Sequence, residues 1–286
     1  MSRTIYINGR YVPETEAQIS IFDRGFLFGD GIYEVSAVIG GHMIDNGLHL
    51  DRLERSLREL EIPMPESRDE IVAIQKSLIA RNALDEGVVY LQVTRGSEDR
   101  NFDYSDVLKP NFVAFTQAKK LLDTDALMNG IKVAIVDDIR WRRRDIKTVM
   151  LLAQVQAKRH AKAQGCSEAW MVQDGFITEG ASSTAFIVTR AGKIVTRPNS
   201  QVTLPGCTRR AVLQAATAHG LQIEERLFTA NEAYLAQEAF LTSASSLVTP
   251  VIEIAGHRVG EGVPGPITRR IQQFYLELAL AQGGSQ

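Results

Sequence analysis

The sequence predicts an α+β protein built from two domains. Segments of strand length gather in groups instead of alternating one by one with helices, which is typical of α+β folds. Amphipathic helical segments separate these groups. A polar connection, KKLLDTDALMNG at residues 119–130, lies between the two halves of a 286-residue chain, which is long enough for two medium domains. We therefore expect an N-terminal domain at residues 1–120, a linker at 121–130 and a C-terminal domain at 131–286.

The first half contains predicted strands around two helices. A helix is expected at residues 49–60, HLDRLERSLREL, where leucines recur at i, i+3 and i+7 from Leu50. A second helix at 67–84 begins at Ser67, and Glu70 completes a capping box three residues later. The strands are expected at 4–12, 19–44, 88–96 and 111–118, with glycine turns inside the first two segments.

The second half repeats this grouping of strands and helices. We expect strands at 131–139, several strands within 168–197, and further strands within 238–259. Helices are expected at 148–165, 208–220 and 265–282.

Composition narrows the classes of function. The formal net charge is -2, so bulk electrostatics favour neither nucleic acid nor an anionic membrane as partner. The start has no apolar core of signal-peptide length, and no stretch approaches 18 apolar residues. The two cysteines, Cys166 and Cys207, form no CxxC pair, which fits a reducing cytoplasm.

Familiar catalytic signatures are missing from the sequence. GEGVPG at 260–265 matches G-x-G-x-x-G literally, but too little chain follows it for a dinucleotide-binding unit, so we interpret it as a turn. No P-loop, GxSxG or HExxH motif occurs, and the five histidines lack metal-ligand spacing. We therefore expect no metal site.

Two residues suit cofactor chemistry. Lys147 follows the basic run at 142–145 and precedes an apolar segment. An amine at the edge of a buried site can form a Schiff base, although most lysines are simply solvated. Glu179, in TEGASSTAF at 178–186, is followed by small residues that let a ligand approach closely. Its carboxylate could hold a pyridinium proton, and a turn glutamate before Gly180 fits equally well.

Other residues suit an anion. In LPGCTRRAVL at 204–213, a glycine turn opens into a helix with Thr208 near its start, where free N–H groups attract negative charge. Thr208 would look much the same as a plain cap. The turn TSASS at 242–246 offers more donors or is a hydroxyl-rich loop. Arg52 lies off the leucine stripe of its helix. A solvated arginine is the default interpretation, and a partner for a phosphate group is the alternative.

Taken together, the segments resemble fold type IV pyridoxal-phosphate enzymes, most closely D-amino-acid aminotransferases. The resemblance covers nearly the whole chain and implies an α+β, two-domain fold with the cofactor pyridoxal 5′-phosphate between the domains, in a homodimer. The segments that carry it, in order, are RGFLFGDGIYE, HLDRL, VTRGSEDR, VDDIRWRRRDIK, TEGASSTAF, LPGCTRR and LTSASSLVTPVIEI.

The resemblance also implies roles for individual residues. Lys147 would be the Schiff-base lysine and Glu179 would face the pyridine nitrogen. Tyr33 would line the substrate pocket, and Arg100 would hold the substrate carboxylate from across the dimer interface. The phosphate would be bound by Arg52, by the backbone at Cys207 and Thr208, and by the turn at Ser243 and Ala244. Leu204 would lie against the cofactor ring.

Phe102 is a departure from the well-studied D-amino-acid enzymes, which have a histidine at this place. A phenyl ring cannot donate a hydrogen bond to a carboxylate. Either Arg100 holds the carboxylate without that help, or the pocket favours a more apolar substrate. Because the flanking segments resemble the D-amino-acid branch best, the resemblance implies transfer from a D-amino acid to 2-oxoglutarate or pyruvate, with transaminases of (R)-amines or branched-chain amino acids as alternatives. An aminodeoxychorismate lyase is a third alternative. A cofactor-carrying binding protein without turnover is the fourth, which the presence of both Lys147 and Glu179 disfavours.

Overall fold

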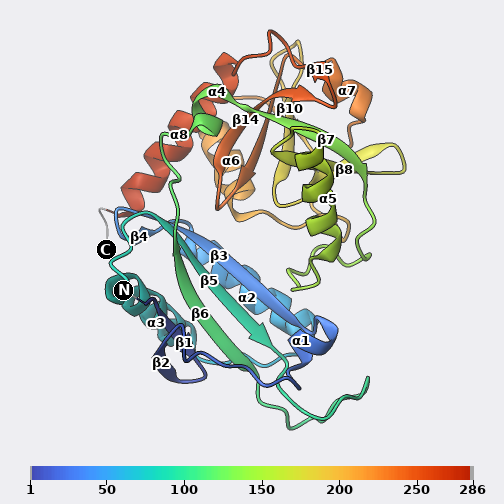
Figure 1. Cartoon of the computed structure of the whole chain (residues 1–286). Coiled ribbons are helices and arrows are strands. Elements are labelled where there is room, and N and C mark those ends of the chain that lie inside the picture. Colours follow the sequence, from blue (N-terminus) through green and yellow to red (C-terminus); the bar gives the residue numbers. More distant parts are fainter. Residues whose placement is uncertain (1, 284–286) are drawn as a thin grey trace. The chain divides into compact units, whose positions relative to one another are not determined.

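The computed structural model describes residues 2–283, so Met1 and the last three residues of the predicted second domain, 284–286, lie outside the described part. The chain divides into two compact units. The first runs to Lys120 and also includes Ile146–Met150, the segment that carries Lys147. The second comprises Leu121–Asp145 and the residues from Leu151 onward. Figure 1 shows the elements of both units.

A six-stranded antiparallel sheet forms the first unit, in the order β2-β1-β6-β5-β3-β4. Its central strands β5 and β6 confirm the strands predicted at 88–96 and 111–118, and buried and less buried residues alternate along most of β6. The strands are β1 (Thr4–Ile7), β2 (Arg10–Pro13), β3 (Gly31–Ile39), β4 (His42–Met43), β5 (Gly87–Thr94) and β6 (Asn111–Ala118).

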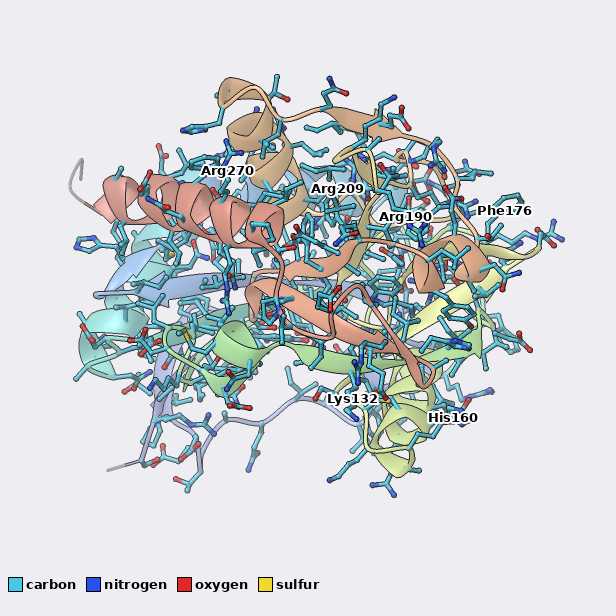
Figure 2. The ribbon with its side chains drawn as sticks, turned by 90° about the horizontal axis from the view of Figure 1, so that it is seen from above. Lys132, His160, Phe176, Arg190, Arg209 and Arg270 are labelled. Carbon is cyan, nitrogen blue, oxygen red and sulfur yellow. The ribbon has the colours of Figure 1, made fainter. Side chains whose placement is uncertain are left out.

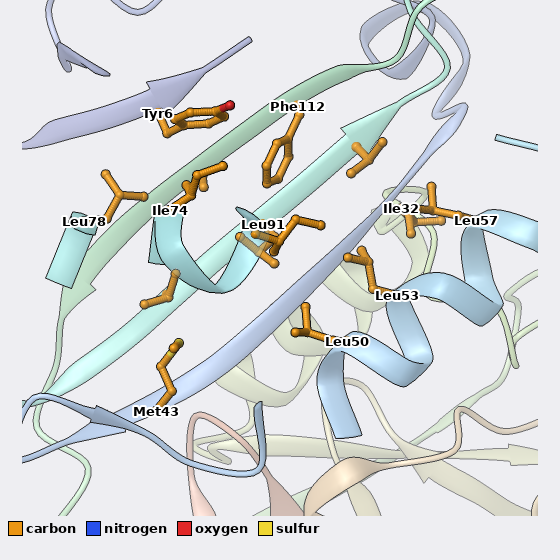
Figure 3. Packing of buried hydrophobic residues seen from close by; sticks show 14 of the residues in the cluster. Tyr6, Ile32, Met43, Leu50, Leu53, Leu57, Ile74, Leu78, Leu91 and Phe112 are labelled. Carbon is orange, nitrogen blue, oxygen red and sulfur yellow. The ribbon is translucent and has the colours of Figure 1, made fainter. Parts of the chain in front are cut away.

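Two helices, α2 (Asn46–Glu59) and α3 (Arg68–Arg81), pack on this sheet. The predicted leucine stripe of α2 is confirmed, since Leu50, Leu53 and Leu57 are almost completely buried and point at the strands in Figure 3. The predicted capping box is also confirmed. The Ser67 hydroxyl accepts from the Glu70 N–H at 3.3 Å, and the Glu70 carboxylate accepts from the Ser67 N–H at 2.9 Å.

Residues within the predicted strand segment at 19–44 instead form a short helix, α1 (Arg24–Phe28). Local capping explains why the strand prediction is wrong here. The Asp23 carboxylate accepts from the Phe26 N–H at 3.0 Å, and Gly29 ends the helix in the left-handed region at φ 70°. The Asp23 cap and the Gly29 conformation stabilise the two ends of a helix that is too short to show a helical period.

The second unit contains a nine-stranded mixed sheet, in the order β12-β11-β10-β13-β14-β7-β8-β9, with β15 paired to β14. β7 pairs in parallel with both β14 and β8, and β10, β13 and β14 are antiparallel neighbours. The strands are β7 (Ile131–Asp137), β8 (Glu168–Gln173), β9 (Phe176–Gly180), β10 (Thr184–Val188), β11 (Ile194–Thr196), β12 (Ile223–Glu225), β13 (Glu238–Ser243), β14 (Leu247–Ile254) and β15 (His257–Arg258).

The helices of this unit are α4 (Asp125–Asn129), α5 (Leu152–Ala163), α6 (Cys207–Ala218), α7 (Ala230–Tyr234) and α8 (Pro266–Gly283). α6 and α8 pack against each other, and Figure 2 labels Arg209 on α6 and Arg270 on α8. The short elements α4, β12 and α7 were not predicted, because each spans too few residues for a period to be read. GEGVPG is a turn as predicted, with Gly260 and Gly262 at φ 51° and 72°.

In the described part of the chain, every helix is too short or too polar to cross a lipid bilayer. The sheets and their covering helices confirm the predicted α+β class.

Candidate functional site

The segment around Lys147 is held against the edge of β3 by an antiparallel β-bridge between Ile32 and Thr148. The Tyr33 N–H donates to the Lys147 carbonyl at 3.0 Å, and the Val149 N–H donates to the Gly31 carbonyl at 3.0 Å. Ile146 is buried in the core of the first unit. Backbone pairing therefore occupies residues 147–149, and the helix predicted from residue 148 begins only at Leu152.

The Lys147 side chain lies over an aromatic ring. Its Nζ is 4.0 Å from the ring centroid of Tyr33. Tyr33 stacks on Tyr90 with centroids 5.6 Å apart, and Tyr90 stacks on Phe115 at 4.7 Å. Within residues 2–283 the Lys147 ammonium makes no ion pair or hydrogen bond. The lysine is thus fixed through its backbone while its amine remains available for chemistry.

Arg52 is buried and ion-paired, so the interpretation as a solvated arginine is wrong. Its side chain is 8% exposed, and its Nε and Nη2 donate to the two oxygens of Glu34 at 2.7 and 2.8 Å. His49 Nδ1 lies 2.8 Å from the same carboxylate. This bidentate pairing orients the guanidinium firmly. Glu34 was not singled out from the sequence, although a charged residue inside an otherwise apolar strand was a usable signal.

The pKa of Glu34 lies well below its ordinary value. Burial alone would raise it, but the charge and hydrogen bonds of Arg52, together with His49, outweigh burial. A carboxyl with a lowered pKa in the folded state stabilises the protein above its unfolded pKa of about 4.3. That contribution is lost as the pH falls toward the folded-state pKa.

We therefore expect Glu34→Gln to lower the free energy of unfolding at pH 7 by about 3–5 kcal/mol, because it leaves the buried Arg52 cation without its counter-charge. The difference between parent and variant should shrink below about pH 4, because the glutamine does not titrate. Urea unfolding at several pH values measures this. The matched control is Glu14→Gln, which removes the exposed pair with Arg3 and should change stability little. A pH-independent difference would contradict the expectation.

Arg100 and Phe102 lie on the exposed loop that follows β5. Phe102 is 79% exposed, and the Arg100 guanidinium lies 5.5 Å from the centroid of its ring and 5.4 Å from that of Phe28. Arg24, which was not identified from the sequence, holds this loop through hydrogen bonds to its backbone. Its buried guanidinium donates to the carbonyls of Asn101 at 2.7 Å and Phe102 at 3.2 Å.

Glu179 lies in the second unit, inside strand β9 and not in a turn, so its reading as a turn glutamate is wrong. Its carboxylate is buried and accepts from Arg140 Nη1 at 2.5 Å. The Leu204 N–H lies 3.2 Å from both of its oxygens. Burial raises the pKa of Glu179 above its usual range, while the charge and hydrogen bond of Arg140 act against this. Leu204, predicted as a ring contact, is thus tied directly to the predicted pyridine partner.

The helix predicted to follow the glycine turn of LPGCTRRAVL is present as α6. Gly206 is the N-cap residue, Cys207 is the first helical residue and Thr208 the second, so Thr208 is not the cap. A glycine offers no side chain to cover the first N–H groups, which leaves them for an anion. Both Cys207 and Thr208 are buried. A Cβ on Gly206 would lie 2.8 Å from Thr184 Oγ1, so a side chain at this position would force Thr184 on β10 to shift.

The second predicted phosphate turn follows β13. Thr184 of β10 lies against Gly206 and pairs with Thr242 of β13. Ser243 is the last residue of β13. The turn at Ser243 and Ala244 is therefore close to the start of α6. The Ser243 and Ser246 hydroxyls are 2.6 Å apart. In the described part of the chain, the buried Thr242 hydroxyl has no hydrogen-bond partner.

These groups match the chemistry of pyridoxal 5′-phosphate. The helix start and hydroxyl turn suit a phosphate, a buried carboxylate suits a protonated ring nitrogen, and an amine suits an aldehyde. Lys147 and Arg52 belong to the first unit, and Glu179, Thr208 and Ser243 belong to the second.

Comparison with known proteins places the chain in a family. The model of amino-transferase class IV matches residues 31–254. A D-alanine aminotransferase of Bacillus licheniformis is 37% identical over 268 residues, covering 94% of each chain. The branched-chain amino acid aminotransferase of Escherichia coli has a similar structure, with a TM-score of 0.91 at 23% identity, covering 99% of this chain and 96% of that chain.

A hypothetical aminotransferase from Mycobacterium tuberculosis, solved in a PLP-bound form, has a TM-score of 0.84 at 22% identity and covers 97% of this chain and 99% of that chain. At this identity the two solved structures establish the fold. The predicted fold family is therefore confirmed, and this chain belongs to the class IV aminotransferases.

Proposed function

We propose that this chain is a pyridoxal-phosphate-dependent transaminase. It moves an amino group from a D-amino acid of the D-alanine type to a 2-oxo acid, 2-oxoglutarate or pyruvate, by a ping-pong mechanism. The observation that carries this proposal is the 37% identity to a D-alanine aminotransferase over 94% of the chain. The buried Arg52 and Glu179 and the amine of Lys147 support it from the structure.

The proposed cofactor contacts divide by chemistry. Arg52, the N–H groups at Cys207 and Thr208, and the turn at Ser243 and Ala244 bind the phosphate. Ala244 has no hydroxyl, so only its backbone N–H contributes. Glu179 pairs with the ring nitrogen, and Leu204 packs on the ring. When bound, pyridoxal phosphate supplies an electron sink for the negative charge that develops at the substrate Cα.

Lys147 carries both proton transfers in this proposal. Its neutral amine takes the proton from the substrate Cα as a general base and returns it at the cofactor's C4′. The backbone pairing to β3 limits where the amine can move, since the lysine carbonyl is tied to the Tyr33 N–H. The same side chain then serves in reverse order with the second substrate, which gives ping-pong kinetics.

Substrate recognition depends on a second copy of the chain in this proposal. We propose a homodimer in which Arg100 of the partner subunit binds the substrate carboxylate, and Tyr33 lines the pocket. Arg100 lies on an exposed loop, where it can reach outward. Phe102 favours a second candidate, a transaminase of (R)-amines, because its phenyl ring offers a carboxylate no donor.

We expect Arg52→Ala to weaken binding of pyridoxal phosphate by about ten- to a hundredfold, the equivalent of one lost charge-assisted contact. Titrating the apoenzyme with pyridoxal phosphate measures the Kd. Arg58→Ala, an exposed arginine on the same helix, is the control and should leave the Kd unchanged. Arg52→Lys keeps the positive charge but loses the planar, bidentate guanidinium, so its Kd should lie between those of the parent and the alanine variant. An unchanged Kd in folded Arg52→Ala would remove Arg52 from the phosphate site.

A donor panel tests the function itself. D-amino acids, L-amino acids and (R)-amines are each offered with pyruvate and with 2-oxoglutarate, and the products are identified. We expect turnover of D-alanine with 2-oxoglutarate and of other D-amino acids with pyruvate, because D-alanine and pyruvate would only exchange an amino group without net change. Turnover confined to (R)-amines or L-branched-chain amino acids would overturn the proposal, and pyruvate formed from aminodeoxychorismate without an acceptor would indicate a lyase.

A further inference from the structure

Glu179 is the end of a chain of charge-assisted hydrogen bonds in the second unit. Arg140 donates to Asp138 through two nitrogens, Nε to Oδ1 at 2.9 Å and Nη2 to Oδ2 at 2.7 Å. Its third nitrogen, Nη1, donates to Glu179 Oε1 at 2.5 Å. The Arg140 side chain is 7% exposed and that of Asp138 is fully buried. All three nitrogens of this guanidinium are therefore committed to carboxylates.

Asp138 is itself fixed by the neighbouring hairpin of β8 and β9. The Thr178 hydroxyl donates to Asp138 Oδ2 at 2.6 Å, and the Asp138 N–H donates to the Val172 carbonyl at 2.8 Å. Arg144 Nη1 lies 3.3 Å from the same carboxylate and donates to Gln173 at 2.6 Å. The position of Arg140 is thus determined by β-hairpin contacts that do not involve Glu179.

We propose that Arg140, anchored by Asp138, is a positioning residue that holds Glu179 ionised and in one orientation for the cofactor's ring nitrogen. This inference rests on the proposed function, since it assumes that Glu179 meets that nitrogen. Arg140 touches neither cofactor nor substrate in this proposal and acts only through Glu179.

The energetics argue for a role beyond stability. Removing two carboxylates and two arginines from water is costly, and apolar residues of similar size often stabilise a core as well or better. Burial raises the pKa of Glu179, which works against the ionised form. A carboxylate that stabilises a protonated ring nitrogen must be ionised, so a fixed cation on its other side keeps it in the required state. Arg140 is that cation.

The orientation of Glu179 follows from the same contacts. Arg140 binds Oε1, and the Leu204 N–H lies 3.2 Å from both oxygens. These donors approach from two different segments of the chain, the residues just after β7 and the loop before α6. A carboxylate held from two sides loses its rotational freedom, which removes an ordering cost when the ring binds.

A double-mutant cycle between Arg140 and Glu179 tests the inference. The variants are Arg140→Met, Glu179→Gln and the pair, with Arg140→Lys as the charge-keeping variant. Three quantities are measured: the absorption spectrum of bound pyridoxal phosphate without substrate, the rate of the D-alanine half-reaction, and the Tm of the apoenzyme. Arg142→Met, an exposed arginine of the same segment, is the matched control and should change none of them.

We expect Arg140→Met to shift the spectrum and to slow the half-reaction by about ten- to a hundredfold in the parent background. In the Glu179→Gln background the same change should alter spectrum and rate less than about twofold, because a positioning residue has no effect without its target. Arg140→Lys should recover part of the lost rate. Asp138→Asn should act in the same direction as Arg140→Met, with a smaller effect.

Additive effects would overturn the inference. If Arg140→Met slows the half-reaction equally in both backgrounds and lowers the apoenzyme Tm, Arg140 is a structural residue only. The inference is also overturned if Arg140→Met and Arg140→Lys both keep the parent absorption spectrum of bound pyridoxal phosphate and the parent rate of the half-reaction. A parent protein that neither binds pyridoxal phosphate nor reacts with any donor overturns the proposed function, and this inference with it.

Discussion

Lys147→Ala is expected to abolish multiple turnover while pyridoxal phosphate still binds through its phosphate. Proton transfer by a positioned side chain is worth about 10²–10⁴-fold, and the variant loses it in both half-reactions. The covalent link to the cofactor is lost as well, so the total decrease in kcat should exceed that range. Steady-state transamination of D-alanine measures turnover, and titration of the apoenzyme measures cofactor binding.

The Lys147 result can be separated from a folding defect. The Lys147 backbone, and not its side chain, pairs with β3, so Lys147→Ala should keep the fold of the first unit and the apoenzyme Tm. Lys132→Ala, at a half-exposed lysine of β7 that is labelled in Figure 2, is the control and should keep normal turnover. Exogenous amines should restore part of the Lys147→Ala activity by replacing the missing base. Near-normal turnover in Lys147→Ala would contradict the proposed mechanism.

The sequence predicted best those elements whose determinants lie close together along the chain. The leucine stripe from Leu50 and the Ser67 capping box depend on residues three or four apart, and both are confirmed. α1 was missed because its five residues are stabilised by its end groups, Asp23 and Gly29, and not by a periodic apolar face. The start of α5 was predicted too early because residues 147–149 pair with β3, a contact across more than 100 residues that no local pattern reveals.

The same limit applies to the candidate site. Lys147, Arg52 and Glu179 were identified through a resemblance, which carries residue roles but not their neighbours. The residues that hold these groups were missed: Glu34 is 18 positions from Arg52, and Arg140 is 39 positions from Glu179. Their pairing depends on sheet register and on how α2 packs on β3. A charged residue inside an apolar strand, such as Glu34, is the one local signal that could have been used.

Arg100→Ala is expected to raise KM for D-alanine by about tenfold or more, the scale of a lost charge-assisted hydrogen bond. Phe102 cannot donate to the carboxylate, so Arg100 of the partner subunit carries most of that recognition in the proposed dimer. An (R)-amine has no carboxylate, and its KM should therefore change little in the same variant. Steady-state kinetics with D-alanine and with an (R)-amine, each with 2-oxoglutarate as acceptor, measure the difference.

Phe102→His tests the same pocket from the opposite direction, since it adds a hydrogen-bond donor and should improve kcat/KM for D-alanine relative to the (R)-amine. Arg24 holds the carbonyls of Asn101 and Phe102, so the loop should keep its shape in both variants. Arg190→Ala, at an exposed arginine of the second unit, is the control for a general loss of charge. If Arg100→Ala leaves KM for D-alanine unchanged while the parent prefers (R)-amines, Arg100 is a surface cation and the chain's substrate is an amine without a carboxylate.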